Sequence, residues 1–396
     1  MQRRDFLKNS GLVSGALLVP GFLKAFDGLP SLITGNKKLV IIQLSGGNDG
    51  LNTLVQYHND VYYRQRNAIA LKKNNLLHIT DEIGFHESLS SFKSLYDEGY
   101  VSIINNVGYP NPSRSHFRST DIWHTASDSN EYSKTGWVGR YLEQVSKNPL
   151  GAIEVDDSLS LLMKGKTING IATKDAKLFY KTARDPYFSK VIDEYENTHL
   201  SEHNLGYLYK TVIDAKSSAS YIYEKTKTYK TRQEYPKNSF GKQLGTISEF
   251  INSGLKTQIF YASLGGFDTH ANQLNAQKRL LKAYSEGITS FVKDLKSTGA
   301  LKDTVVLTFS EFGRRLKQNA ANGTDHGAAN LVFLMGENLK HPGIYNAPAN
   351  LVDLDANGDI KYEVDFRDIY ASLLQEWLKT DPSRILNGRY KTLGLV

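Results

Sequence analysis

The stretch LVIIQL at residues 39–44, followed by SGGNDG at residues 45–50, decides the class of fold. The first six residues are apolar almost throughout. Such a continuous run is typical of a β-strand buried on both faces, as in a parallel sheet between helices. The glycines that follow let the backbone turn tightly where the strand ends. The pair of segments predicts a buried strand that leads into a turn at the carboxyl edge of a sheet.

Similar apolar runs recur along the chain, at residues 101–104, 258–262, 304–309 and 331–335. Helical patterns lie between them. In residues 276–295 apolar side chains repeat every three or four positions, and residues 367–378 repeat in the same way. Strands that alternate with helices predict an α/β fold, with a doubly wound, mostly parallel sheet and helices on both faces.

The segment 185–242 interrupts this alternation, because it is rich in Tyr and Lys and has few aliphatic runs. We interpret it as a helical insertion or cap on one α/β domain that spans residues 36–396. A gripping surface for glycans or anionic polymers is one interpretation of its Tyr and Lys residues. A solvated helix face is the alternative.

The N-terminus carries MQRRDFLK at residues 1–8, with paired arginines, and an apolar stretch follows at residues 11–22. That stretch is shorter than the roughly 20 residues needed to span a bilayer, and it is typical of a signal segment. Twin arginines are an address read by an export receptor. We therefore expect residues 1–35 to direct the chain through the twin-arginine translocase to the periplasm or the exterior. No clean cleavage site is evident, so retention at the membrane by an uncleaved leader stays open.

The composition, 40% hydrophobic and 22% charged residues, is that of a globular protein with a core. The absence of cysteine excludes disulfides, thiolate nucleophiles and thiolate metal sites. Any metal must be held by oxygen or imidazole ligands, which favours zinc, manganese or calcium. The net charge of +7 is modest for 396 residues and no concentrated basic arm is present, so we expect no nucleic-acid partner.

Ligands of an open α/β sheet bind beyond the carboxyl ends of its strands. Acidic and imidazole side chains follow several of the predicted strands, and Asp325 and His326 come just before the strand 331–335. We predict that six of these residues form a metal site: Asp49, Asp268, His270, Glu311, Asp325 and His326. A structural polar edge is the alternative. If the chain stays on this edge from residue 313 to residue 326, the strand 331–335 must run antiparallel.

A second group of candidates follows the strand 101–104, in the sequence PSRSHFRS at residues 112–119. A helix beginning here would favour an anion at its N-terminus, and arginine is a good partner for phosphate or sulfate. We predict a nucleophile and oxyanion site made from Ser113, Arg114, Ser115, His116 and Arg118. The alternative is a capping serine beside a solvated basic turn.

The order of these motifs resembles the bacterial family labelled domain of unknown function 1501, which is grouped with the alkaline phosphatase–sulfatase superfamily. The segments that carry the resemblance are residues 45–50, 112–117, 265–270, 310–314, 325–327 and 365–367. The resemblance implies that Asp49 is a metal ligand, that Asp268 and His270 share one metal, and that His326 completes that site. It implies Ser115 as the nucleophile, with Ser113 in reserve.

The sequence departs from the superfamily pattern in two places. Ser310 and Glu311 stand where an Asp-His pair is usual, and no Cys or Ser occupies the position of the sulfatase nucleophile. The resemblance therefore implies an exported metal-dependent hydrolase of phosphate or sulfate esters, acting on a small molecule or a glycan. The alternative is a non-catalytic cell-envelope binding or assembly protein on a degenerate hydrolase scaffold. Substrate, metal identity and oligomeric state stay open.

Overall fold

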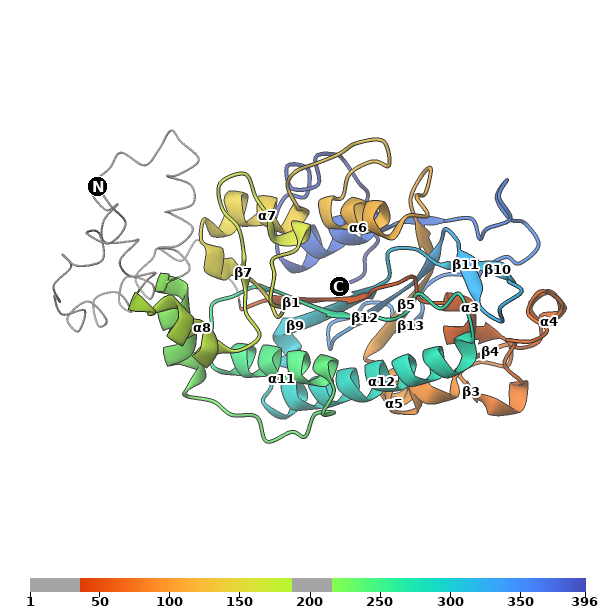
Figure 1. Cartoon of the computed structure of the whole chain (residues 1–396), viewed down its shortest axis with the longest axis horizontal. Helices are drawn as coiled ribbons and strands as arrows, with labels where there is room; N and C mark the ends of the chain where they lie inside the picture. Colours follow the sequence, from red (N-terminus) through yellow and green to blue (C-terminus); the bar gives the residue numbers. More distant parts are fainter. Residues whose placement is uncertain (1–35, 187–215) are drawn as a thin grey trace, which may run out of the picture.

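The computed structural model describes residues 36–186 and 216–396, and in these residues a nine-stranded sheet forms the centre of the molecule (Figure 1). Its strands lie in the order β13-β5-β12-β9-β1-β8-β6-β7, with β14 beside β5. Their bounds are β1 Lys38–Leu44, β5 Val101–Gly108, β6 Ala152–Glu154, β7 Ile171–Ala172, β8 Ile259–Leu264, β9 Thr304–Phe309, β12 Asn330–Met335, β13 Gly343–Ile344 and β14 Val364–Asp365.

Strand direction follows the prediction from sequence. The central strand β1 pairs in parallel with both β8 and β9, whereas β12 runs antiparallel to β5 and β9. The chain between β9 and β12 stays at the carboxyl edge, where it forms a hairpin of β10 (Arg314–Gln318) and β11 (Thr324–His326). The predicted antiparallel strand at residues 331–335 is therefore confirmed, as is the mostly parallel sheet.

Helices cover both faces of the sheet, with α5, α11 and α12 on one face and α6 and α7 on the other (Figure 1). Alternate residues of β1 pack into the two layers: Val40 and Ile42 enter one core, and Leu39 and Ile41 enter the other. This two-sided burial explains why the strand is apolar almost throughout. The helix bounds are α5 Ser90–Asp97, α6 His116–Thr125, α7 Trp137–Tyr141, α11 Ser239–Asn252, α12 Gln273–Ser297 and α13 Phe366–Ser372.

The two helices predicted from periodicity are present. The first is α12, which extends the predicted residues 276–295 by about one turn at its N-terminus. The second begins as α13, where the side chain of Asp365 accepts a hydrogen bond from the backbone N–H of Arg367. It continues as a wider turn over Leu373–Trp377. Asp365 also forms a bidentate ion pair with the Arg367 side chain, so this cap is charge-assisted.

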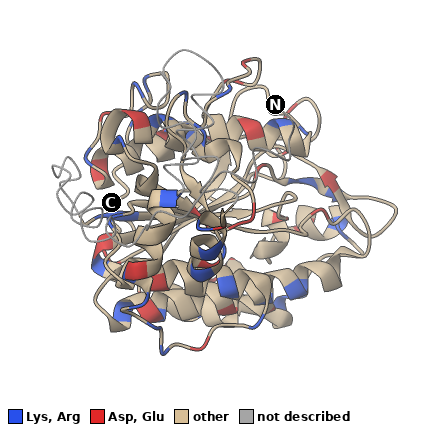
Figure 2. Ribbon diagram, turned by 60° about the vertical axis from the view of Figure 1, so that its left-hand side comes forward, with Lys and Arg blue, Asp and Glu red and all other residues tan. Residues whose placement is uncertain are grey.

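Smaller elements not predicted from the sequence lie around the sheet. Strands β2 (Leu54–Gln56), β4 (Ile83–His86) and β3 (Leu76–His78) form a separate sheet, and the helices α3 (Gly50–Thr53), α4 (Asp60–Gln65) and α8 (Ala176–Ala183) are short. Basic and acidic residues are interspersed along the helices of the face seen in Figure 2.

The predicted leader, residues 1–35, lies outside the described residues, as do residues 187–215 of the predicted insertion. Of the rest of that insertion, residues 216–226 are helical, and α11 begins at Ser239. Within residues 36–186 and 216–396, every helix is too short or too polar to cross a membrane.

Candidate metal centre

Three connections at the carboxyl edge of the sheet bring histidines and aspartates together. His116 begins α6 after β5, Asp268 and His270 follow β8, and His326 ends β11. We call His116, Asp268, His270 and His326 the histidine–aspartate cluster. Parallel strands place their carboxyl ends on one edge, which is why residues far apart in sequence meet here.

One carboxylate oxygen lies at the middle of this cluster. Asp268 Oδ1 is 3.2 Å from His116 Nε2, 3.0 Å from His270 Nε2 and 3.1 Å from His326 Nε2. The guanidinium of Arg314 donates to the same oxygen over 2.9 Å. The Asp268 side chain is 47% exposed, so the centre of the cluster is open to solvent.

Each ring is held through its other nitrogen. His116 Nδ1 is 2.9 Å from Glu311 Oε1, His270 Nδ1 is 3.2 Å from Asp325 Oδ1, and His326 Nδ1 is 2.7 Å from the carbonyl oxygen of Arg114.

A carbonyl or carboxylate oxygen only accepts hydrogen bonds, so each Nδ1 carries the proton and donates it. In the neutral imidazole, Nε2 then keeps its lone pair and can bind a metal. In the protonated imidazole, Nε2 carries a second proton and can donate it to Asp268 Oδ1, which lies 3.1 Å from His326 Nε2.

This donor set fits a divalent cation. Among the described residues, the ligand atoms of His116, Asp268 and His326 lie within 4.8 Å of one another. His116 Nε2 is buried and has no hydrogen-bond partner in the described part of the chain. His270 is a fourth potential ligand, because its Nε2 lies 2.8 Å from that of His326. Imidazole and carboxylate ligands suit a borderline metal, and rings fixed through Nδ1 are typical of metal-binding histidines.

The electrostatics of the cluster keep its acids charged. Partial burial pushes the pKa of Asp268 upward, but hydrogen bonds from Arg314 and His326 outweigh burial and hold that pKa below its ordinary value. The hydrogen bond from Asn319 lowers the pKa of Asp325. The hydrogen bond to Glu311 raises the pKa of His116.

Glu311, predicted as a metal ligand, lies behind His116. Its carboxylate is buried and accepts hydrogen bonds from the backbone N–H of Gly46 (2.8 Å) and from the Gln43 amide (3.3 Å). Asp325 takes the equivalent place behind His270. Both acids therefore orient a ring in this structure. Ser310 instead links two turns, since its hydroxyl donates to Leu44 O over 2.5 Å and accepts from Asn48 N–H over 2.8 Å.

Asp49 lies in a buried ion pair. Its Oδ2 is 2.5 Å from Arg66 Nη1, and both side chains are almost fully buried. Asp49 also caps α3 by accepting from Leu51 N–H, and it accepts from the Gln273 amide. Its contacts are thus with a guanidinium, an amide and a helix terminus, whereas the ligand atoms that lie together come from the histidine–aspartate cluster.

A glycine allows the first turn to approach the cluster. Gly46 has a φ of +115°, and a Cβ built on it would lie 2.5 Å from the backbone nitrogen of Asp268. A larger residue would therefore clash with backbone atoms. The turn after β1 supports the loop that carries Asp268.

The predicted nucleophile loop lies against the cluster. Ser115 is the N-cap residue of α6, its side chain makes no capping hydrogen bond, and it is exposed. It stands between Arg114, whose carbonyl holds His326, and His116 itself. Ser113 is partly buried, and its hydroxyl accepts from the backbone N–H of Ser115 over 3.3 Å.

The nearby arginines are engaged by protein acceptors. Arg114 Nε donates to Asp359 over 2.8 Å. The Arg118 guanidinium donates to backbone carbonyls of the loop 128–131 and stacks on Tyr132, 4.1 Å from the ring centroid. Arg314 is fully buried and donates to the carbonyls of Gly46 and Gly47 in the first turn, to that of Thr324, and to Asp268.

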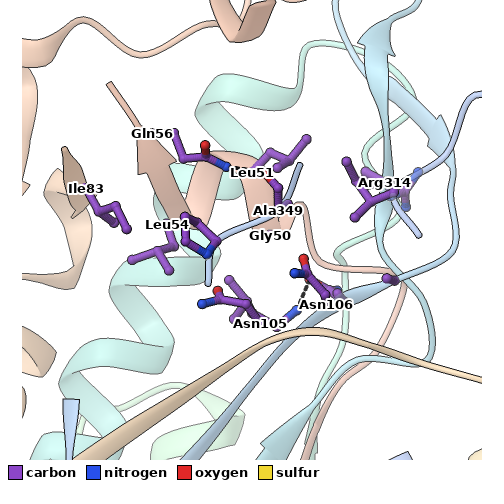
Figure 3. A pocket seen from close by; sticks show the side chains of 14 residues that line it. Gly50, Leu51, Leu54, Gln56, Ile83, Asn105, Asn106, Arg314 and Ala349 are labelled. Atoms are coloured by element: carbon purple, nitrogen blue, oxygen red, sulfur yellow. Dashed lines mark hydrogen bonds between the residues drawn. The ribbon is translucent and has the colours of Figure 1, made fainter. Parts of the chain in front are cut away.

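A small cavity of about 40 Å³ lies on the other side of Arg314. Gly50, Leu51, Asn105, Asn106 and Ala349 are among its lining residues (Figure 3). A water molecule needs about 10–15 Å³ measured in this way, so the cavity holds a few waters and no ester substrate.

Three residues of this region were missed by sequence reasoning or given another role. His116 was expected beside the nucleophile, yet its ring belongs to the cluster. Its position in the loop that follows a predicted strand could have indicated a metal ligand. Arg66 had no motif around it, and Gln43 was treated only as part of the buried strand LVIIQL, where a polar residue at an apolar position was the available signal.

Solved structures with a similar fold cover most of the chain at low identity. A protein in the alkaline phosphatase superfamily from Vibrio parahaemolyticus matches with a TM-score of 0.43 and 10% identity, over 98% of this chain and 78% of that chain. The C-terminal periplasmic domain of EcEptC from Escherichia coli, in complex with Zn, matches with a TM-score of 0.39 and 12% identity, over 92% and 93%. A phosphonate monoester hydrolase from Silicibacter pomeroyi matches with a TM-score of 0.41 and 8% identity, over 90% and 76%.

No curated protein sequence matches the chain. A family model described as "Protein of unknown function (DUF1501)" matches residues 91–388, which include all four residues of the histidine–aspartate cluster. The chain therefore belongs to the DUF1501 family.

Proposed function

We propose that this protein is an exported, metal-dependent hydrolase of phosphate or sulfate esters. The observation that carries the proposal is the convergence of three imidazole Nε2 atoms on Asp268 Oδ1, while each Nδ1 is held by a fixed acceptor. With neutral rings, four electron-pair donors meet there, and Arg314 donates a hydrogen bond to the same Asp268 oxygen. A cation between the donors would relieve their mutual repulsion.

His116, His270, His326 and Asp268 would hold the metal. Three imidazoles favour zinc or manganese over calcium, which prefers oxygen ligands. When bound, such a cation polarises an ester oxygen and lowers the pKa of a coordinated hydroxyl or water.

Ser115 is the proposed nucleophile, because its exposed hydroxyl stands between two residues that contact the cluster. The first backbone N–H groups of α6 come directly after Ser115 in the chain and would stabilise negative charge on an ester bound there. The arginines were expected to do this, but Arg114, Arg118 and Arg314 are bonded to protein acceptors. Glu311 and Asp325 would keep the rings of His116 and His270 in position.

The substrate would be a small-molecule or glycan ester in the periplasm or outside the cell, reached through the twin-arginine translocase. The half-exposed Asp268 and His270 side chains support access by a bulky ester. The leader sequence supports this location, and the solvent-exposed carboxyl edge of the sheet supports access for the substrate.

A second candidate function is a metal-stabilised, non-catalytic protein of the cell envelope. Four protein ligands in a closed tetrahedron are typical of structural zinc sites, whereas catalytic sites keep a position for water. The binding of all three arginines to protein acceptors also favours this candidate.

Metal analysis of the purified full chain tests the proposal, with the double variant Asp268→Ala/His326→Ala as the comparison. We expect about one equivalent of a divalent metal in the wild type and loss of that metal in the double variant. Hydrolysis of aryl phosphate and aryl sulfate esters by the metal-loaded wild type, abolished in Ser115→Ala, would establish the hydrolase. A tightly bound metal without ester hydrolysis would favour the structural candidate, and a wild type without metal affinity would overturn both.

A further inference from the structure

We propose that Gln43 is a positioning residue for the metal centre, acting on His116 through Glu311. The inference rests on the metal centre of the proposed function, and it adds a residue that does not itself contact the cluster. It follows from a chain of buried hydrogen bonds that runs from the middle of the sheet to the ring of His116.

Gln43 is a polar residue at an apolar position. It lies in β1 between Ile42 and Leu44, and only 2% of it is exposed. A buried amide is unfavourable unless its hydrogen bonds are made. Here both ends of the amide have partners, so the residue is placed for its hydrogen bonds and not for packing alone.

The side-chain oxygen of Gln43 faces hydrogen-bond donors, and its side-chain nitrogen faces acceptors. Its Oε1 accepts from the hydroxyl of Tyr261 (2.7 Å) and from His124 Nε2 (3.1 Å). Its Nε2 donates to Glu311 Oε2 (3.3 Å) and lies 3.4 Å from Thr120 Oγ1. Tyr261 and His124 come from opposite sides, β8 and α6, and both are buried.

These partners fix the orientation of the amide. Burial lowers the pKa of His124 to about 4 and raises that of Tyr261, so both are neutral at ordinary pH and each has one N–H or O–H to donate. The amide oxygen must face these two donors. The NH₂ group therefore faces the Glu311 carboxylate, which can only accept.

Glu311 transmits this orientation to the cluster. Its Oε1 accepts from Gly46 N–H (2.8 Å) and from His116 Nδ1 (2.9 Å), while Oε2 receives the Gln43 amide. The carboxylate is thus held at both oxygens. Without Gln43, Oε2 would be buried without its donor, and the carboxylate could rotate about the remaining bonds. The ring of His116 would then lose its fixed direction toward Asp268.

Groups that hold a metal-binding histidine, as Glu311 holds His116, typically contribute about 10- to 100-fold to metal affinity. Gln43 acts one residue further out, so we expect Gln43→Leu to weaken the affinity for a divalent metal by the lower end of that range, about 10-fold.

Gln258 offers a matched control. It is also a buried glutamine whose Oε1 accepts from a tyrosine hydroxyl, that of Tyr141, over 2.6 Å. It precedes β8 and so lies at the opposite, amino edge of the sheet. Gln258→Leu removes a comparable buried amide with no connection to Glu311.

The test is titration of the full chain with Co²⁺, recording affinity and the visible d–d absorption, which reports the ligand geometry. For Gln43→Leu we expect a dissociation constant about 10-fold higher and altered bands. For Gln258→Leu we expect wild-type bands and an affinity within about threefold of wild type. Wild-type affinity and bands in Gln43→Leu, or an equal loss in both variants, would overturn the inference.

The milder variant Tyr261→Phe serves if Gln43→Leu does not fold. It keeps the amide and removes one of the two donors that fix it, so we expect weaker Co²⁺ binding than in wild type; unchanged binding would overturn the inference. A wild-type protein that binds no Co²⁺, Zn²⁺ or Mn²⁺ would instead overturn the proposed function itself, and this inference with it.

Discussion

The substitution Asp49→Asn separates two roles for this residue. The family resemblance implies that Asp49 binds metal, whereas the structure places it against Arg66, Gln273 and the start of α3. The amide of Asn keeps nearly the same shape and removes the charge. It would leave the Arg66 guanidinium buried without a counter-charge.

The expected loss of unfolding free energy follows from the surroundings of Arg66. Its guanidinium is fully buried and bonds to Asp49 Oδ2 (2.5 Å), Asn52 Oδ1 (3.0 Å), Leu316 O (2.9 Å) and Arg315 O (2.7 Å). Loss of one partner of a buried ion pair costs about 3–5 kcal/mol. Three of the four acceptors would remain, so we expect the lower end, about 3 kcal/mol, or roughly a hundredfold in the unfolding equilibrium.

Urea unfolding of the full chain measures this stability change, and a Zn²⁺ titration of the same variant measures metal affinity. We expect the variant to be destabilised by about 3 kcal/mol. We expect its affinity for Zn²⁺ to stay within about threefold of wild type. Asp294→Asn is the matched control: this buried carboxylate bonds to the hydroxyls of Tyr235 (2.9 Å) and Ser248 (2.6 Å) and has no contact with the cluster. A stable Asp49→Asn variant that has lost its metal would refute the reasoning and restore Asp49 as a ligand.

Three further predictions concern stability. Burial raises the pKa of Glu154 to about 7 from 4.5, so the unfolded chain releases this proton first and stability should fall by about 3 kcal/mol between pH 4.5 and pH 7; Glu154→Gln should flatten that part of a pH series of urea midpoints. Zn²⁺ at 100 times its dissociation constant should stabilise the protein by about 2.7 kcal/mol, seen in thermal melts, and no shift would mean no binding to the folded state. Gly46→Ala should cost about 2 kcal/mol or more in unfolding free energy, because the new Cβ meets the backbone of Asp268, and an unchanged urea midpoint would contradict this.

Much of the central sheet could be predicted from sequence because its strands are long and apolar on both faces. The antiparallel direction of β12 followed from one consideration, that Asp325 and His326 should lie on the same edge as Glu311. The short strands β2, β4 and β6 could not be predicted, since three or four residues give too little periodicity.

The site was predictable in composition but not in the role of each residue. Asp49 and Glu311 follow predicted strands as candidate ligands should, and Asp325 comes shortly before one, yet the structure gives each a nearer partner: Arg66, His116 and His270. A carboxylate at a strand exit can bind a metal, orient a histidine or neutralise an arginine. Only the three-dimensional neighbours decide among these, and Arg66 comes from a short helix with no recognisable motif.

The cluster also sets an order of events during biosynthesis. The hydrogen bond between His326 and Arg114 spans 212 positions, and that between His116 and Glu311 spans 195. Ligands so far apart meet only after the central strands have paired, so a metal ion cannot nucleate this fold as zinc nucleates a short finger. The ion would enter a nearly finished protein, and its identity would be decided by the compartment in which the chain completes its folding.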